Sequence, residues 1–297
     1  MIDKLDCFLT LARVQHFARA AAECGVTQPT LSAAIKSLEE ELGVLLVVRG
    51  SRFQGLTPEG QRVLEWARRI VGDARTLKEE MRAARRGLAG HMQIAVIPTA
   101  LSAAPRLTTP FRARHPEVTF SILSRTSVQI LSLIENHEID AGITYLDNEP
   151  MGRVATVPLY RERYRLVANR DQIGGRASIR WADAAKFALC LLTPDMQNRR
   201  IIDRHLIEAG TRVTPTLESN SMIVLYAHVK TGQWASIMPA DLVDTLGLSE
   251  PLAAVPIVEP DTSHVIGLVA PFREPHTPLV SALLYEARAA SQMGDSD

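Results

Sequence analysis

The sequence predicts an α+β protein of several domains, with a small helical N-terminal domain, a long connecting helix and a C-terminal α/β domain of two lobes. Three observations predict this arrangement. The chain has 297 residues, more than one typical domain of roughly 100–200 residues. Residues 63–88 carry an apolar repeat that few globular helices keep. From residue 91 onward, β-prone runs alternate with helical patterns, as they do in α/β folds.

The composition is that of an ordinary globular chain. Hydrophobic residues make up 46% and charged residues 22%, and no segment approaches the roughly 18 uninterrupted apolar residues of a membrane span. The first residues run directly into a helical pattern, unlike an export signal, so we expect a cytoplasmic protein with no membrane partner. Cys7, Cys24 and Cys190 are widely spaced and form no metal-ligand pattern, which favours small core residues and no metal or cofactor.

The charge is unevenly distributed although the net charge is zero. Residues 1–90 hold 14 Lys and Arg against 11 Asp and Glu, whereas residues 91–297 hold 19 against 22. This mild excess of positive charge permits an N-terminal contact with nucleic acid without demanding one.

Residues 1–43 read as three helices around a tight turn. An apolar stripe predicts a first helix that ends near His16, and the alanine-rich segment 17–24 predicts a second helix that Gly25 terminates. A third helix is predicted over residues 27–43, because Thr27 is a good N-cap, proline follows in the first turn, and glycine can end the helix. Its buried stripe is predicted to be Leu31, Ile35, Leu38 and Leu42.

The opposite face of the third helix carries short or hydrogen-bonding side chains that could approach a DNA major groove closely. Taken alone, this pattern also fits any solvated helix face. The β-prone run 44–48 and the glycine-bounded segment 49–55 predict a hairpin wing, whose arginines would contact phosphates or the minor groove. The predicted DNA-binding residues are Thr27, Gln28, Pro29, Thr30, Ser32, Ala33, Lys36, Arg49, Arg52 and Thr57.

Residues 59–89, which follow the DNA-binding domain at 1–58, are predicted to form a linker helix that pairs two subunits. Their apolar positions alternate steps of four and three, the repeat of a coiled coil. The alternative is an amphipathic helix packed on its own subunit, since three alanines make the seam thin. The seam comprises Val63, Ala67, Ile70, Ala74, Leu77, Met81, Ala84 and Leu88.

Residues 90–297 are predicted to fold as two α/β lobes with largely parallel sheets, crossed by two strands. Lobe I would comprise residues 90–160 and 266–297, and lobe II residues 161–265. The expected strands are 92–97, 119–124, 141–145, 164–169, 187–192, 215–218, 235–238 and 264–270, and the expected helices are 103–114, 128–136, 198–209, 222–231 and 278–290.

Three strand-to-helix junctions of these lobes carry hydroxyl groups. Ligands in such sheets bind beyond the carboxyl ends of strands, where helix N-termini present free N–H groups that suit a small anion. Each junction could equally be a capped helix. We expect Ser102 and Thr193, on opposite lobes, to bridge the ligand, unless bulky side chains close the site. The candidate effector-binding residues at these junctions are Pro98, Thr99, Ala100, Leu101, Ser102, Ser127, Thr193 and Met196.

Two segments resemble the LysR-type family of bacterial transcription regulators. The first runs from Ala18-Arg19-Ala20-Ala21 through Val26-Thr27-Gln28-Pro29-Thr30-Leu31-Ser32 to Leu42-Gly43, and the second is Leu56-Thr57-Pro58-Glu59-Gly60, similar to the family's Leu-Thr-x-x-Gly. One departure is Leu46-Val47-Val48-Arg49, where the family usually has Leu-Phe-x-Arg, so an aromatic core contact is lost.

This resemblance implies a winged helix-turn-helix, a linker helix and a sensor domain like a periplasmic binding protein. It also implies a double-stranded DNA operator, a small effector in place of a cofactor, dimers that pair into a homotetramer, and a contact with RNA polymerase if the protein activates. Three further effector-binding candidates, Thr144, Tyr145 and Asn220, are implied only by this resemblance. The whole sequence further resembles the subgroup found beside formate dehydrogenase genes. The effector, the operator and the sign of regulation are not encoded in any motif.

Three other classes of protein fit the sequence less well than a regulator. An enzyme is not favoured, because the chain lacks G-x-S-x-G, P-loop, G-x-G-x-x-G and H-E-x-x-H motifs and its eight histidines form no short-spaced pair. A transport-type binding protein should carry an export signal and lack a recognition helix. An architectural DNA binder would not need the C-terminal lobes.

Overall fold

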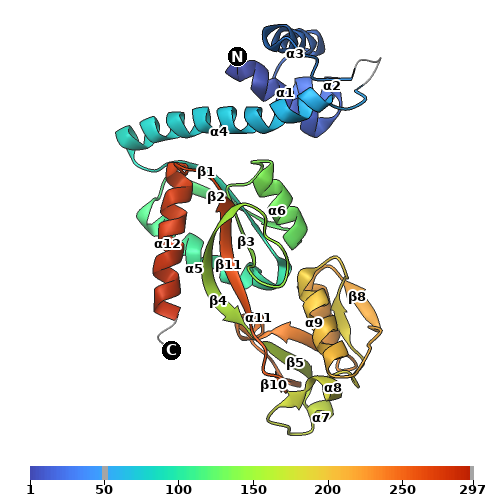
Figure 1. Ribbon diagram of the computed structural model, residues 1–297. Helices are drawn as coiled ribbons and strands as arrows, with labels where there is room; N and C mark the ends of the chain where they lie inside the picture. Colours follow the sequence, from blue (N-terminus) through green and yellow to red (C-terminus); the bar gives the residue numbers. More distant parts are fainter. Residues whose placement is uncertain (49–52, 295–297) are drawn as a thin grey trace. The chain divides into compact units, whose positions relative to one another are not determined.

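Figure 1 shows the computed structural model, which describes residues 1–48 and 53–294. The chain consists of two compact units, Met1–Arg85 and Arg86–Asp297. The boundary between them falls inside the predicted linker segment. Among the described residues, no helix is both long enough and apolar enough to cross a membrane.

The first unit begins with the three predicted helices, α1 (Ile2–Val14), α2 (Phe17–Glu23) and α3 (Gln28–Leu42). The Thr27 hydroxyl caps α3 by accepting from the Thr30 N–H at 3.4 Å, and Gly43 ends it with a φ of 70°. Leu31, Ile35 and Leu38 are buried as predicted. Leu42, the last position of the predicted stripe, is 39% exposed, so the prediction is wrong there. Leu42 is the final residue of α3 and lies beyond the part of the helix that packs on the core.

The β-prone run 44–48 pairs antiparallel with the segment that follows the predicted wing, through a bridge between Val47 and Leu56 and a hydrogen bond from the Val48 N–H to the Gly55 carbonyl at 3.0 Å, although the pairing is too short to form a strand. The tip of the predicted wing, residues 49–52, lies outside the described residues. Phe53 follows it and packs edge-on against Phe17 of α2, with ring centroids 6.4 Å apart. This pair gives the core of the first unit an aromatic contact, although Val47 stands where the family usually has phenylalanine.

Helix α4 (Pro58–Arg86) confirms a long linker helix but changes the interpretation of its seam. Val63 and Ala67 pack with Val71 in the core of their own unit, so the seam there is intramolecular. Leu88 lies beyond the end of α4 and packs against the core of the second unit. The predicted seam is therefore wrong at both ends.

Lobe I of the second unit is built on a five-stranded sheet in the order β2-β1-β3-β11-β4. Its strands are β1 (Gly90–Val96), β2 (Val118–Ser124), β3 (Ala141–Tyr145), β4 (Val154–Glu162) and β11 (His264–Pro271). β1 pairs in parallel with β2 and β3, whereas β11 runs antiparallel to β3 and β4. The predicted largely parallel sheet is thus mixed, because β11 brings the chain back from lobe II in the opposite direction.

Helices cover this sheet and deliver the groups of the cleft. They are η1 (Pro98–Ala103, a 3-10 helix), α5 (Pro105–Arg114), α6 (Ser127–Glu135) and α12 (Pro278–Gly294). Figure 1 shows α6 and α12 on opposite sides of the sheet. η1 follows the end of β1 and α6 follows β2, so both begin beyond the carboxyl ends of parallel strands.

Lobe II contains a four-stranded sheet in the order β6-β10-β5-β9 and a parallel pair, β7 with β8. The strands are β5 (Tyr164–Asn169), β6 (Ile179–Arg180), β7 (Cys190–Leu192), β8 (Leu217–Ser219), β9 (Ser236–Pro239) and β10 (Leu252–Val258). The helices are α7 (Arg170–Ile173), α8 (Trp181–Ala184), α9 (Gln197–Glu208), α10 (Met222–Val229) and α11 (Ala240–Leu246).

The larger sheet of lobe II also departs from the parallel prediction, since β5 runs antiparallel to both β9 and β10. The prediction missed β4, β6, β10, α7, α8 and α11. β10 contains Pro256, and a proline within an apolar run argues against a central strand when only the sequence is known. Two connections link the lobes, from β4 into β5 and from β10 into β11, as the predicted pair of crossings requires.

Candidate DNA-binding surface and effector cavity

The structure brings most of the predicted DNA-binding residues together on one exposed face at the start of α3. Because the buried stripe of α3 faces the core, this polar face is left free for a partner. Lys36 forms only a solvent-exposed ion pair with Glu40, at 3.5 Å, and can exchange it for a phosphate. The exposed predicted residues are Thr27, Gln28, Pro29, Thr30, Ser32, Ala33 and Lys36.

The other three predicted DNA-binding residues are not part of that face. Arg49 and Arg52 lie outside the described residues. Thr57 is half-buried, and its hydroxyl donates to the Leu45 carbonyl at 2.6 Å and accepts from the Gly60 N–H at 2.9 Å. The Thr57 side chain therefore caps the start of α4.

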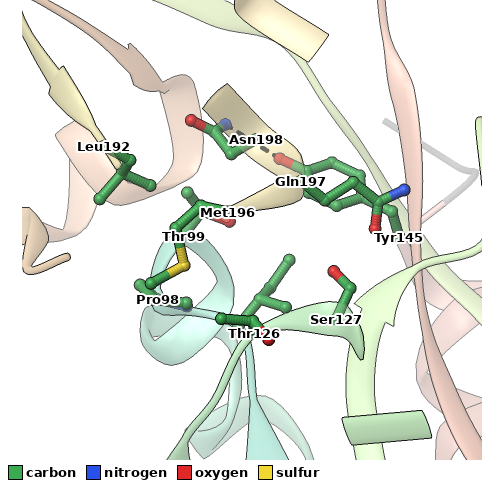
Figure 2. A pocket seen from close by; sticks show the side chains of 10 residues that line it. Pro98, Thr99, Thr126, Ser127, Tyr145, Leu192, Met196, Gln197 and Asn198 are labelled. Carbon is green, nitrogen blue, oxygen red and sulfur yellow. Dashed lines mark hydrogen bonds between the residues drawn. The ribbon is translucent and has the colours of Figure 1, made fainter. Parts of the chain in front are cut away.

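A small cavity lies between the two lobes, where η1 and α6 of lobe I meet the start of α9 of lobe II (Figure 2). About 10 Å³ is open to the centre of a water molecule, room for about one water. The lining residues are Ile97, Pro98, Thr99, Thr126, Ser127, Tyr145, Leu192, Met196, Gln197 and Asn198.

Five predicted effector-binding residues line this cavity: Pro98, Thr99, Ser127, Tyr145 and Met196. The other six do not, namely Ala100, Leu101, Ser102, Thr144, Thr193 and Asn220. Thr144 is fully buried behind the cavity and donates to the Ser127 hydroxyl at 3.0 Å. Asn220 is exposed. Ser102 and Thr193, the predicted bridge, do not line this cavity, although the hydroxyl of each is buried without a hydrogen-bond partner.

Lobe II contributes residues that the candidate set omitted, chiefly Gln197 and Asn198. Both occupy the first turn of α9 and are buried. The signal for them was available, since the segment from Thr193 to Asn198 opens a predicted helix at one of the three junctions. Ile97, Thr126 and Leu192 complete the omitted set.

The cavity offers hydrogen-bond donors without a charged side chain in its lining. The start of α6 is closed by a capping box, in which Thr126 accepts from the Gln129 N–H and Gln129 accepts from the Thr126 N–H. The start of α9 has no side-chain cap, so its first N–H groups remain available. The Thr99 hydroxyl is buried and has no hydrogen-bond partner. This combination suits a small polar or anionic ligand.

A buried polar network continues behind the cavity. Tyr145 donates a hydrogen bond to the carboxyl group of Glu162, and Asn198 Nδ2 donates to the Tyr145 hydroxyl at 3.0 Å. Burial raises the pKa of Glu162 to about 7 and holds the pKa of Tyr145 well above its usual value. Sequence reasoning missed Glu162, because an acid within a strand carries no signal of its own.

Neither the cysteines nor the histidines form a metal centre among the described residues, where no group of three potential ligands comes together. Cys190 is buried within β7, and burial raises the pKa of its thiol to about 11. Cys7 and Cys24 are half-buried in the first unit. No cysteine lines the cavity between the lobes.

A helix-turn-helix unit followed by a two-lobed α/β domain with a polar cavity defines a DNA-binding regulator that responds to a ligand. Residues 2–61 match the family described as "Bacterial regulatory helix-turn-helix protein, lysR family". Residues 85–292 match the family described as "LysR substrate binding domain". The chain therefore belongs to the LysR family of transcriptional regulators, a family of regulators rather than enzymes.

Known relatives cover nearly the whole chain. The Escherichia coli DNA-binding transcriptional dual regulator OxyR is 28% identical over 95% of this chain and 94% of its own. A full-length OxyR variant from Pseudomonas aeruginosa has a similar structure, with a TM-score of 0.77, 26% identity, and coverage of 98% of this chain and 99% of that one.

A more distant solved structure shows the fold alone. CbnR in complex with its target DNA gives a TM-score of 0.63 at 23% identity, over 98% of this chain and 99% of that one. None of these names bears on the subgroup associated with formate dehydrogenase genes, which stays a prediction.

Proposed function

We propose that this LysR-family protein is a transcription regulator controlled by a small anion bound in the cavity between its two lobes. The observation that carries this proposal is the juxtaposition of the Thr99 hydroxyl, buried without a partner, with the uncapped start of α9. An unpaired buried hydroxyl is costly unless a ligand satisfies it, and helix N-termini favour negative charge. The cavity must open slightly to admit an effector larger than one water.

Thr99→Val provides the sharpest test of this effector site. The variant keeps the shape and removes the hydroxyl, so the stability of the ligand-free protein should be unchanged or higher. Affinity for the effector should fall by about 1–3 kcal/mol, because a hydrogen bond to a charged group is lost. Ligand-dependent thermal shifts against a panel of small carboxylates and phosphorylated metabolites measure both quantities. Thr109→Val, at an exposed position on α5, is the matched control. Equal affinities in all three proteins would place the effector elsewhere.

For DNA recognition, we propose that Gln28 and Ser32 read base edges while the wing arginines contribute sequence-independent affinity. Gln28→Ala and Ser32→Ala should each lower the ratio of specific to non-specific binding by about 1–3 kcal/mol. Arg52→Ala should weaken both kinds of binding. Affinities are compared on an operator fragment selected from random DNA and on its scrambled duplex. An unchanged ratio in both α3 variants would contradict the assignment.

A second candidate effector is hydrogen peroxide bound without covalent change. Several relatives are named hydrogen peroxide-inducible genes activators, among them one from Haemophilus influenzae that is 25% identical over 97% of both chains. The cavity is also of nearly the size of such a ligand. Thiol oxidation in the cleft is not supported, because Cys190 is buried outside the lining. The test compares the effect of peroxide on the DNA footprint of three proteins. An equal change in wild type and Cys190→Ser, with a smaller change in Thr99→Val, would favour this alternative.

The assembly proposed for DNA binding is a dimer through α4, with dimers pairing into a tetramer. A dimer lets two helix-turn-helix units read two half-sites of one operator. The same architecture implies action in the cytoplasm and, for an activator, a contact with RNA polymerase.

A further inference from the structure

Glu162 occupies a position where a carboxyl group is costly. It is 1% exposed and lies at the end of β4, where the chain crosses from lobe I to lobe II. It does not line the cavity, but it accepts a hydrogen bond from Tyr145, which does. Its second oxygen, Oε2, is buried without a hydrogen-bond partner. An unpaired oxygen is far cheaper to bury on a neutral acid than on a carboxylate.

The groups around Glu162 supply hydrogen bonds and negative charge rather than a counter-ion. Tyr145 from β3, Tyr164 from β5 and Asn198 from α9 surround it, and Tyr160 of its own strand and Asp241 of α11 lie nearby. Asp241 pairs with Arg106 at 2.5 Å, and the His264 ring of β11 meets the Tyr145 ring edge-on, with ring centroids 6.3 Å apart. Among the residues that the structure describes, no cation lies within ion-pair distance of Glu162. The polar and charged residues around Glu162 are therefore Tyr145, Tyr160, Tyr164, Asn198, Asp241, Arg106 and His264.

The hydrogen bonds give Glu162 control over two side chains of the cavity. The single proton of the Tyr145 hydroxyl is donated to Glu162, so its oxygen is free to accept from Asn198. This bond turns Asn198 Nδ2 toward Tyr145, and Figure 2 shows the Asn198 oxygen pointing away from it. Glu162 therefore orients Tyr145 and, through it, Asn198.

We propose that Glu162 is a positioning residue of the effector site and that an anionic effector binds together with one proton, which solvent delivers to the Glu162 carboxylate. This inference rests on the anion site proposed above. An anion in the cavity would place a second negative charge close to Glu162 in a region of low dielectric. Protonation of the carboxylate removes that repulsion, so occupancy and protonation favour one another. The regulator would thus respond to its effector and to pH together.

The first test measures the pH dependence of anion binding to the full-length protein. Formate is the probe, because its charge stays constant between about pH 6 and about pH 9. Burial raises the pKa of Glu162 to about 7. Above that pH, wild-type affinity should fall by up to about tenfold per pH unit, because each binding event must take up a proton. Glu162→Gln, which cannot ionise, should bind formate with no such slope. Glu117→Gln, an exposed control in lobe I, should keep it. An equal slope in Glu162→Gln and wild type overturns the proposal.

The second test needs no effector and so separates this inference from the anion site itself. Infrared spectra of the full-length protein should show the carbonyl stretch of a protonated carboxyl group at about pH 6, lost by about pH 9 and absent in Glu162→Gln. Asn198→Asp fixes an anion in the cavity and should move that loss to higher pH. Absence of the band in wild type, or no movement in Asn198→Asp, overturns the proposal. If formate binds no variant, the anion site fails while the infrared result still decides the role of Glu162.

Discussion

Gly60 shows how a single residue joins α4 to the rest of the first unit. A Cβ at this position would lie 2.1 Å from the carbonyl oxygen of Leu46, a backbone atom that cannot move aside alone. The same Leu46 carbonyl accepts from the Thr57 N–H at 3.0 Å. The glycine of the Leu56–Gly60 motif is therefore explained by a close approach of two backbone segments.

Gly60→Ala should destabilise the first unit by about 1–3 kcal/mol, because the added methyl group forces α4 and the Leu46 segment apart. Operator affinity should fall with it. Urea unfolding followed by tryptophan fluorescence, to which Trp66 of α4 contributes together with Trp181 and Trp234 of the second unit, measures the change as a shift in the transition that the Trp66 contribution follows. Glu59→Ala, one residue earlier and exposed, is the control. Equal stability of the two variants would mean that the backbone relaxes at little cost.

Glu39 of α3 is a second residue with a role beyond its helix. Its Oε1 accepts from the Leu46 N–H at 2.8 Å and from the Val47 N–H at 3.2 Å. Glu39→Ala leaves both donors unpaired and should cost about 1–3 kcal/mol of unfolding free energy. Glu40→Ala removes an exposed acid from the next position and should change stability by less than about 0.5 kcal/mol. Chemical denaturation compares the two, and similar losses would refute the role of Glu39.

At the scale of the element, the apolar residues of α4 fall into a buried group and an exposed group. Those near its start pack inside the first unit, whereas four large apolar side chains remain exposed. Arg69 lies over one of them, with its guanidinium 5.5 Å from the centre of the Trp66 ring. An exposed apolar stripe on a helix indicates a partner helix. The exposed residues are Trp66, Ile70, Leu77 and Met81.

Replacing Ile70 and Leu77 by Asp should dissociate the subunits that α4 pairs. These side chains are 39% and 59% exposed in the single chain, so the substitutions place charge in the interface without disturbing the unit's own core. Light scattering should report a smaller particle than wild type. The control changes two exposed polar positions of the same helix, Arg75→Asp and Lys78→Asp. If the doubly substituted variant and wild type have the same mass, the stripe has another use.

At the scale of the whole C-terminal unit, a histidine pair connects the lobes. His205 of α9 and His264 of β11 are buried, and their Nε2 atoms lie 3.0 Å apart. Only one of these nitrogens can carry the shared hydrogen, so a charge on both rings is disfavoured. The loss of hydration on burial is the main cause that lowers the pKa of each imidazole. The helix that supplies Asn198 to the cavity is thereby attached to a crossing strand.

The sign of the pH effect follows from these lowered pKa values. The unfolded chain binds protons at an ordinary histidine pKa of about 6.5, whereas the folded pair resists them, so stability is lost as pH falls below that value. Each group contributes at most about 1.4 kcal/mol per pH unit. Melting temperatures are measured in the Glu162→Gln background, because the raised pKa of Glu162 acts in the opposite direction.

Two substitutions in that background assign the effect. His264→Gln should flatten the loss of stability at acid pH, because the pair no longer exists. His91→Gln, at an exposed position of β1, should leave the pH profile unchanged. A profile that His264→Gln does not alter would assign acid sensitivity to other groups.

Local patterns determined the helices of the first unit, the linker helix and most strands of lobe I by themselves, because caps, glycines and apolar periodicity act within a few residues of one another. They also located the three junctions from which the cavity is built. Tertiary structure alone decided which side chains meet there: Gln197 and Asn198 rather than Thr193, with Glu162 behind them. It also decided the antiparallel course of β11 and which apolar residues of α4 stay inside their own unit. Those outcomes depend on which distant segments come into contact, and no spacing along one segment carries that information.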